Sequence, residues 1–125
     1  MRDIAIVYMT FSSGHNQKGP MFYMSTEDAM KFCSDKRTSG GGFGGGWHMV
    51  WIRLEHYAEC FPKPSKIKRW QNDRGDFEVI CDELGITIFD RDEINAYIES
   101  VYDNLDETYK KRRTNNNEKT SIYIN

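Results

Sequence analysis

Basic and aromatic side chains are the residues of this chain with the clearest chemical potential. Arg69 directly precedes Trp70, and Arg112 and Arg113 close a run of four basic residues. A guanidinium group can bind a phosphate through two parallel hydrogen bonds, and an indole ring can stack on a nucleobase or a cation. These residues predict a site for a flat, anionic small molecule. A surface turn and a helix end stabilised by its dipole are the alternatives for the two segments.

A glycine-rich segment, Ser39–Gly46, contains six of the ten glycines, carries Phe43 near its centre and leads directly into Trp47. Backbone N–H groups of such loops can cradle phosphates. The segment lacks the GxxxxGK[ST] pattern, however, and a strand is expected after it, whereas a dinucleotide fingerprint opens a helix. We therefore predict a connector, or a lid with Phe43 as a mobile ring.

The histidines and cysteines show no spacing typical of a metal site or a disulfide framework. Cys33 and Cys81 fall on apolar helix faces and are predicted to lie in the core. Cys60 follows His56 by four residues in a segment expected to be a loop, where a Cys–His pair is the functional alternative. We predict no metal, no cofactor and no catalytic residue.

The length of 125 residues and the net charge of -2 predict one domain, 1-125, with a tail at 114-125 that could dock on a neighbouring subunit. Near neutrality disfavours bulk DNA binding. Charge is nevertheless segregated, because nine acidic residues and one basic residue lie between Asp82 and Glu107. No apolar run is long enough to span a membrane, and no signal region is recognisable, so we expect a cytoplasmic protein.

The first half of the chain predicts strands around one helix. Ile4–Phe11 is rich in β-branched and aromatic residues and is expected to be a central strand, paired in a hairpin with 21–24. Ser25 is expected to cap a helix over 26–34. The alternating apolar residues of 47–55 predict an interior strand.

The second half predicts two helices. Asp76 is expected to cap a short helix that ends at Gly85, and Asp90 opens a long amphipathic helix that ends at 115–117. The order of elements predicts an α+β fold, with helices on one face of a mainly antiparallel sheet. The apolar stripe of the C-terminal helix is expected to be mainly core, with self-association covering any excess. It comprises Ile94, Tyr97, Ile98, Val101, Tyr102, Leu105 and Tyr109.

Four segments together resemble those of the phage anti-Thoeris sponge family. They are the strand 4–11, the stretch 19–24 that leads into a capped helix, the aromatic strand 47–54, and a C-terminal helix ending in 110–113. The resemblance covers most of the chain, in length and in the order of elements. It implies a small oligomeric protein without catalysis that sequesters cyclic ADP-ribose isomers made by bacterial TIR-domain enzymes. Some members also hold cyclic oligonucleotides.

The expected function is therefore sequestration of a nucleotide-derived signalling molecule by a homo-oligomer, in the cytoplasm of an infected bacterial host. A protein-binding inhibitor such as an anti-CRISPR, using the acidic segment, and a small cyclic-nucleotide hydrolase are the alternatives. Arg112 and Arg113, replaced together by Ala, are expected to abolish ligand retention. The predicted ligand-binding residues are Phe43, Trp47, Arg69, Trp70, Phe89, Asn95, Tyr109, Arg112 and Arg113.

Overall fold

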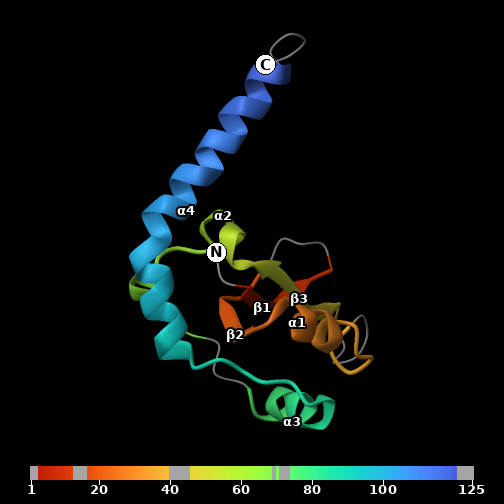
Figure 1. Cartoon of the computed structure of the whole chain (residues 1–125). Helices are drawn as coiled ribbons and strands as arrows, with labels where there is room; N and C mark the ends of the chain where they lie inside the picture. The colour runs from red at the N-terminus through yellow and green to blue at the C-terminus, as the bar shows by residue number, and fades with distance from the viewer. Residues whose placement is uncertain (1–2, 13–16, 40–45, 69, 71–73, 121–125) are drawn as a thin grey trace.

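A three-stranded antiparallel sheet forms the centre of the computed structural model, with strand order β2-β1-β3 (Figure 1). The strands are β1 (Ala5–Phe11), β2 (Pro20–Met24) and β3 (Trp47–Arg53). The structure describes residues 3–12, 17–39, 46–68, 70 and 74–120, with side chains as far as residue 105. The combination of this sheet with four α-helices makes the fold α+β, as the sequence predicts.

The central position of β1 follows from its composition. Residues 5–8 of this strand are all buried, since both faces of the sheet are covered. Ile6 lies opposite Tyr23 of β2 and Ile52 of β3, and the pairing with β2 shifts register between Val7 and Tyr8. The predicted central strand and hairpin are therefore confirmed.

The prediction that β3 is an interior strand is wrong, because among the described residues β3 pairs only with β1 and forms an edge of the sheet. On its outer side, the Met49 N–H donates to the carbonyl of Thr38 in the preceding loop, at 2.8 Å. The strand is apolar on both faces because each face packs against a different core cluster. Met49 faces one core cluster, and Val50 packs against the other. β3 also ends earlier than expected, at Arg53, and the 3-10 turn η1 (Leu54–His56) follows.

Two helices cover one face of the sheet. They are α1 (Thr26–Cys33) and α3 (Gly75–Leu84), which contact each other as well as the sheet. Buried side chains from both helices complete the first core cluster. Met30 of α1 lies outside this cluster and is 54% exposed. The cluster contains Ala5, Val7, Phe22, Met24 and Met49 from the strands and Ala29, Phe32, Ile80 and Cys81 from the helices.

The opposite face is covered by α4 (Arg91–Thr120) and the short helix α2 (Tyr57–Cys60). The expectation of helices on one face only is therefore wrong, and Figure 1 shows α4 on the other side of the sheet from α1 and α3. The apolar stripe of α4 is core as far as its side chains are described, since Ile94, Ile98 and Leu105 are buried and the other described members pack against them. The second cluster contains Ile4, Ile6, Tyr8, Tyr23, Leu54, Tyr57, Phe61, Ile94, Ile98 and Leu105.

Three of the six predicted helix boundaries are confirmed by local geometry, and α1 ends at Cys33, one residue before the predicted end at 34. Ser25 Oγ accepts from the Asp28 N–H at 3.1 Å, and Asp90 Oδ1 accepts from the Glu93 N–H at 2.9 Å. Gly85 ends α3 in the left-handed region with φ of 71°, which glycine adopts without a Cβ penalty.

Two boundaries differ from the prediction. Asp76 lies in the first turn of α3, because the first backbone hydrogen bond of that helix runs from the Glu78 N–H to the Arg74 carbonyl. The backbone of α4 continues through 115–117 to Thr120, since asparagine weakens a helix by under ~1 kcal/mol and does not by itself end one. Within the described residues, no helix is both long enough and apolar enough to cross a bilayer.

Candidate functional site

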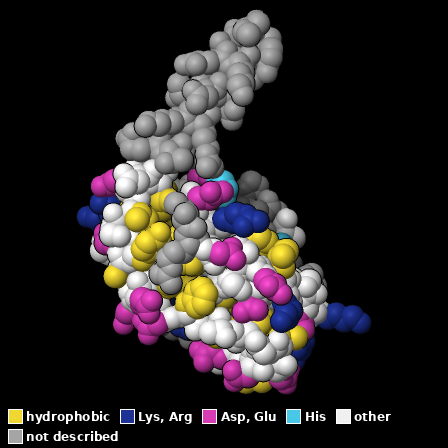
Figure 2. Space-filling model, in the orientation of Figure 1, with side chains coloured by type: hydrophobic (Ala, Val, Ile, Leu, Met, Phe, Trp, Pro, Cys, Tyr) yellow, Lys and Arg dark blue, Asp and Glu magenta, His cyan; other side chains and the backbone are white. Residues whose placement is uncertain are grey.

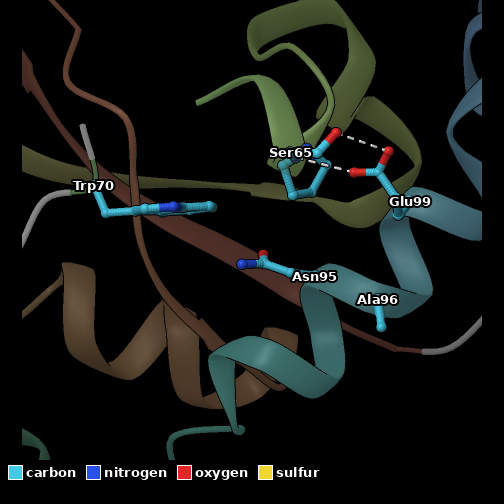
Figure 3. Close-up of a pocket in the computed structure, with 6 residues that line it drawn as sticks. Ser65, Trp70, Asn95, Ala96 and Glu99 are labelled. Carbon is cyan, nitrogen blue, oxygen red and sulfur yellow. Dashed lines mark hydrogen bonds between the residues drawn. The ribbon is translucent and has the colours of Figure 1, made fainter. Parts of the chain in front are cut away.

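A hollow of about 250 Å³ lies between α4 and the segment that follows α2. Its floor and one wall come from α4, and the other wall comes from the 3-10 turn η2 (Pro64–Lys66) and from Trp70 (Figure 3). This volume is below the roughly 300–1,000 Å³ of pockets that enclose a whole drug-sized ligand. It is therefore suited to one ring system. The lining residues are Pro64, Ser65, Trp70, Asn95, Ala96 and Glu99.

Two hydrogen bonds fix the carboxylate of Glu99. Its Oε2 accepts from the Ser65 backbone N–H at 3.0 Å, and its Oε1 accepts from the Ser65 hydroxyl at 3.1 Å (Figure 3). Two contacts on the neighbouring turns hold the same segment against α4. The Tyr102 hydroxyl donates to the Phe61 carbonyl at 2.9 Å, and Lys63 Nζ lies 3.5 Å from Asp103 Oδ1. The wall formed by η2 is therefore attached to α4 at several points.

The amide of Asn95 is oriented from beneath by the sheet. The hydroxyl of Tyr23, a buried residue of β2, donates to Asn95 Oδ1 at 2.7 Å. Burial raises the pKa of Tyr23, which keeps its hydroxyl protonated and able to donate. Since the oxygen of Asn95 faces Tyr23, the amide nitrogen is the end available to the hollow, where Figure 3 shows it below the indole of Trp70.

A guanidinium accompanies the Trp70 ring. The Arg91 guanidinium carbon lies 5.1 Å from the ring centroid, within the range of a cation–π contact. Arg91 also donates from Nη2 to the Met21 carbonyl at 3.3 Å. Burial, and next the nearby charge of Arg74, lower the pKa of Arg91, although a guanidinium remains charged at neutral pH. The ring therefore borders the hollow and also lies next to a positive charge.

The hollow combines three kinds of recognition group. Trp70 offers a flat apolar surface, Asn95 offers an N–H donor, and Glu99 offers only acceptors. Such a set can hold a planar polar ring by packing against the indole and by hydrogen bonds at the ring edge. The Ser65 hydroxyl, the one side-chain hydroxyl among the lining residues, is already bonded to Glu99.

The structure brings together two of the predicted site residues, Trp70 and Asn95. Trp47 lies elsewhere, with its ring 5.3 Å from that of Phe11 and 5.0 Å from Lys18 Nζ. Phe89 packs against the core cluster on the α4 face, where its backbone N–H donates to the Tyr23 carbonyl at 2.7 Å. Outside the described part lie Phe43, Arg69 and the side chains of Tyr109, Arg112 and Arg113.

The length of α4 separates Arg112 from the hollow within one chain. Asn95 and Arg112 are seventeen residues apart on one helix. At 1.5 Å of rise per residue, their backbones are about 25 Å apart along a straight helix axis. A shared site for Asn95 and Arg112 therefore requires a second copy of the chain or a ligand of that span.

Sequence reasoning missed Ser65, Glu99 and Arg91. Asn95 and Glu99 are four residues apart, a spacing that places both on one face of a helix next to the buried Ile94 and Ile98. That spacing can be read from the sequence. Glu99, however, is one of nine acidic residues between Asp82 and Glu107, and nothing local distinguishes it from the others. The contribution of η2 could not be read, because only the fold brings Ser65 to Glu99 across 34 positions.

The cysteines are not arranged as nucleophiles. Burial raises the pKa of the Cys33 and Cys81 thiols to about 12, which keeps them protonated near neutrality. Burial also raises the pKa of Cys60, and the neighbouring His56 is hydrogen-bonded to Glu59. No group of three or more potential metal-ligating side chains occurs among the residues the structure describes.

Comparison of the chain with protein-family models, curated proteins and solved structures finds no match. The resemblance to the sponge family therefore stays a prediction. What the protein binds has to be inferred from the geometry of the hollow itself.

Proposed function

We propose that this protein is a non-catalytic binding protein that captures a nucleotide-derived signalling molecule by its base. The observation that carries this proposal is the arrangement of Trp70, Asn95 and Glu99 around one hollow of about 250 Å³. Indole packing together with an oriented donor and acceptor is a common way for proteins to bind a nucleobase. A base fills such a hollow, and the rest of the ligand remains outside it.

The charge next to the hollow supports the same proposal. The Arg91 guanidinium lies against the Trp70 ring, so an anionic group attached to the base can approach a positive charge without entering the hollow. Glu99, in contrast, repels a phosphate inside the hollow itself. The two charges therefore favour one orientation of the ligand, with the base inside and the phosphate towards Arg91.

The resemblance supports a more specific proposal. Under it, the ligand is a cyclic ADP-ribose isomer or a cyclic oligonucleotide, and its removal blocks TIR-dependent defence in the cytoplasm of an infected bacterium. Sequestration needs no nucleophile and no general base. It needs only retention of the intact ligand, which a homo-oligomer with several hollows would increase.

Two matched tryptophan variants test the proposal. Trp70→Leu removes the ring that lines the hollow, and Trp47→Leu removes a similarly half-buried ring that packs against Phe11. Thermal shift and calorimetry against cyclic ADP-ribose isomers and cyclic oligonucleotides are expected to identify a ligand of the wild-type chain. A ligand at 100 times its dissociation constant adds about 2.7 kcal/mol of stability. Trp70→Leu is expected to weaken binding about tenfold or more, whereas Trp47→Leu is expected to preserve it.

The fate of the ligand distinguishes capture from hydrolysis. Heating the complex and analysing the released molecule by mass spectrometry is expected to return it unchanged. A changed product would support the hydrolase alternative. Equal affinity of the two tryptophan variants, or no ligand among the panel, would contradict the proposed site.

The acidic surface favours a second candidate, a protein-binding inhibitor. Six acidic side chains between Asp82 and Asp103 are exposed, and Figure 2 shows acidic groups over the part of the molecule that contains α3 and the start of α4. Such a surface can compete with nucleic acid for a basic partner. This candidate predicts binding to an effector complex that weakens steeply with salt and is indifferent to Trp70→Leu. The six residues are Asp82, Glu83, Asp90, Asp92, Glu93 and Asp103.

A further inference from the structure

We infer that the hollow selects bases that carry an exocyclic amino group beside a ring nitrogen, as adenine and cytosine do, and that Glu99 sets this selectivity. The inference rests on the proposed function and specifies the chemistry of the base. It comes from the fixed orientation of two polar groups on adjacent turns of α4, Asn95 and Glu99.

Glu99 presents acceptors in a fixed position. A carboxylate has no N–H or O–H to donate, and each of its oxygens can accept more than one hydrogen bond. Ser65 occupies one acceptor position on each oxygen. The remaining positions can accept from an amino group of a ligand in the hollow, but they repel a carbonyl oxygen.

Asn95 presents a donor in a fixed position. An asparagine amide can normally reverse its ends to suit a ligand. Here the Tyr23 hydroxyl donates to Oδ1 at 2.7 Å, which directs the oxygen end of the amide towards Tyr23. The amide nitrogen therefore serves the hollow and can donate to a ring nitrogen.

The donor and acceptor lie one helical turn apart, so their order distinguishes bases of the same shape. Adenine and cytosine offer an amino group beside an unprotonated ring nitrogen, which matches Glu99 and Asn95. Hypoxanthine and uracil offer a carbonyl beside a protonated ring nitrogen, which is the reverse order. A buried polar group left opposite a like group loses a hydrogen bond and its solvation, so mismatched bases bind more weakly.

Matched nucleotide pairs test this inference by calorimetry on the full chain at constant ionic strength. Adenosine monophosphate is compared with inosine monophosphate, and cytidine monophosphate with uridine monophosphate. The wild-type protein is expected to prefer the amino member of each pair by about 10- to 100-fold, the range for hydrogen bonds to a charged group. Glu99→Gln is expected to reduce that preference to about threefold or less, because glutamine can present either an oxygen or an NH₂ group.

Two control variants separate selectivity from folding and charge. Glu93→Gln removes the same charge from an exposed position on the same helix and is expected to keep the preference. Ser65→Ala removes only the hydroxyl tether and keeps the carboxylate, so the preference is expected to survive in reduced form. Thermal midpoints of all variants show whether the fold is retained.

The possible outcomes distinguish the two proposals. Nucleotide binding that is sensitive to Trp70→Leu but equal for both members of each pair would overturn the selectivity inference and leave the proposed function standing. An unchanged preference in Glu99→Gln would overturn the role of Glu99. Absence of binding of all four mononucleotides to the wild-type chain at millimolar concentration would overturn both.

Discussion

At the residue scale, the buried hydroxyl of Tyr23 connects the sheet with the candidate site. Tyr23 belongs to the core cluster on the α4 face, and its hydroxyl orients the Asn95 amide at the edge of the hollow. The adjacent Tyr57 hydroxyl is also buried, and it makes no well-formed hydrogen bond with the described residues. A polar group inside a core is costly unless it is bonded, so the bond between Tyr23 and Asn95 serves both folding and the site.

Removal of this hydroxyl is expected to affect binding more than folding. Tyr23→Phe should lower the free energy of unfolding by about 0.5–1.5 kcal/mol, the net value of a typical hydrogen bond. It should also weaken adenosine monophosphate binding several-fold, because Asn95 is no longer held. Tyr8→Phe is the matched control, since Tyr8 is buried in the same core cluster and does not line the hollow. Urea unfolding and calorimetry compare them, and an equal loss of affinity in both would contradict the positioning role.

Buried thiols predict a loss of stability at alkaline pH. The pKa of Cys81 is about 12 in the folded chain because burial disfavours the thiolate, whereas an unfolded thiol ionises near ~8.5. The contribution to stability is therefore complete below about pH 8.5 and is lost as pH rises towards 12. At pH 10.5 this thiol alone should destabilise the fold by on the order of 2 kcal/mol.

Urea unfolding of Cys81→Ala between pH 7.5 and 10.5 tests this expectation. The variant is expected to be less stable at pH 7.5, because it leaves a cavity, but to lose less stability at alkaline pH than the wild type. The same pH dependence in both proteins would show that Cys81 is not the group responsible.

At the element scale, α4 both completes the core and forms the floor of the hollow. Ile94 and Ile98 are buried against the sheet, while Asn95 and Glu99 line the hollow one position further along. A helix can do both because 3.6 residues per turn place these two pairs on adjacent faces. The geometry of the site therefore depends on how firmly the first turns of α4 are held.

The N-cap of α4 is expected to support the site as well as the helix. Asp90→Ala removes the acceptor of the Glu93 N–H and should lower the free energy of unfolding by about 0.5–2 kcal/mol. Adenosine monophosphate affinity should fall as well, since Arg91 directly follows Asp90 and Asn95 lies in the second turn of the same helix. Asp92 also lies in the first turn but does not form the cap. Asp92→Ala is therefore expected to have a smaller effect on stability and on affinity. Urea unfolding and calorimetry measure the two effects, and similar values for both variants would argue against a role for the cap.

At the scale of the whole molecule, the distance between Asn95 and Arg112 along α4 determines whether one chain or two are needed to bring both residues to one ligand. One chain places Arg112 about 25 Å from Asn95 along the helix axis, so both can serve one small ligand only if two copies combine. The predicted homo-oligomer would allow this, because the same contact can then be made reciprocally around a symmetry axis.

Light scattering coupled to size exclusion is expected to give a mass of two or more chains of 14.7 kDa each. In that assembly, Arg112→Ala combined with Arg113→Ala should abolish retention of a cyclic ADP-ribose isomer with little change in thermal midpoint. Binding of adenosine monophosphate, which needs mainly the hollow, should change less than threefold. A mass of one chain, or unaltered retention in the double variant, would contradict a contribution from the basic residues of a second copy.

Much of the fold can be predicted from the sequence because the signals are local. The composition of β1, the caps at Ser25 and Asp90 and the stop at Gly85 each depend on residues within a few positions of one another. The site was less predictable. The sequence predicts both Trp70 and Asn95 as ligand-binding residues, but nothing local indicates that they share a hollow.

The sequence by itself determined the approximate positions of the three strands and of α1, α3 and α4, since periodicity and end signals act over short distances. Only the tertiary structure decided that β3 lies at an edge, that helices cover both faces, and that Ser65 meets Glu99. These outcomes depend on which apolar faces pack together across the whole chain. A segment that is apolar on both faces, such as β3, is compatible with a central strand and with an edge strand whose two faces are covered. Only the packing of the whole chain decides between these two positions.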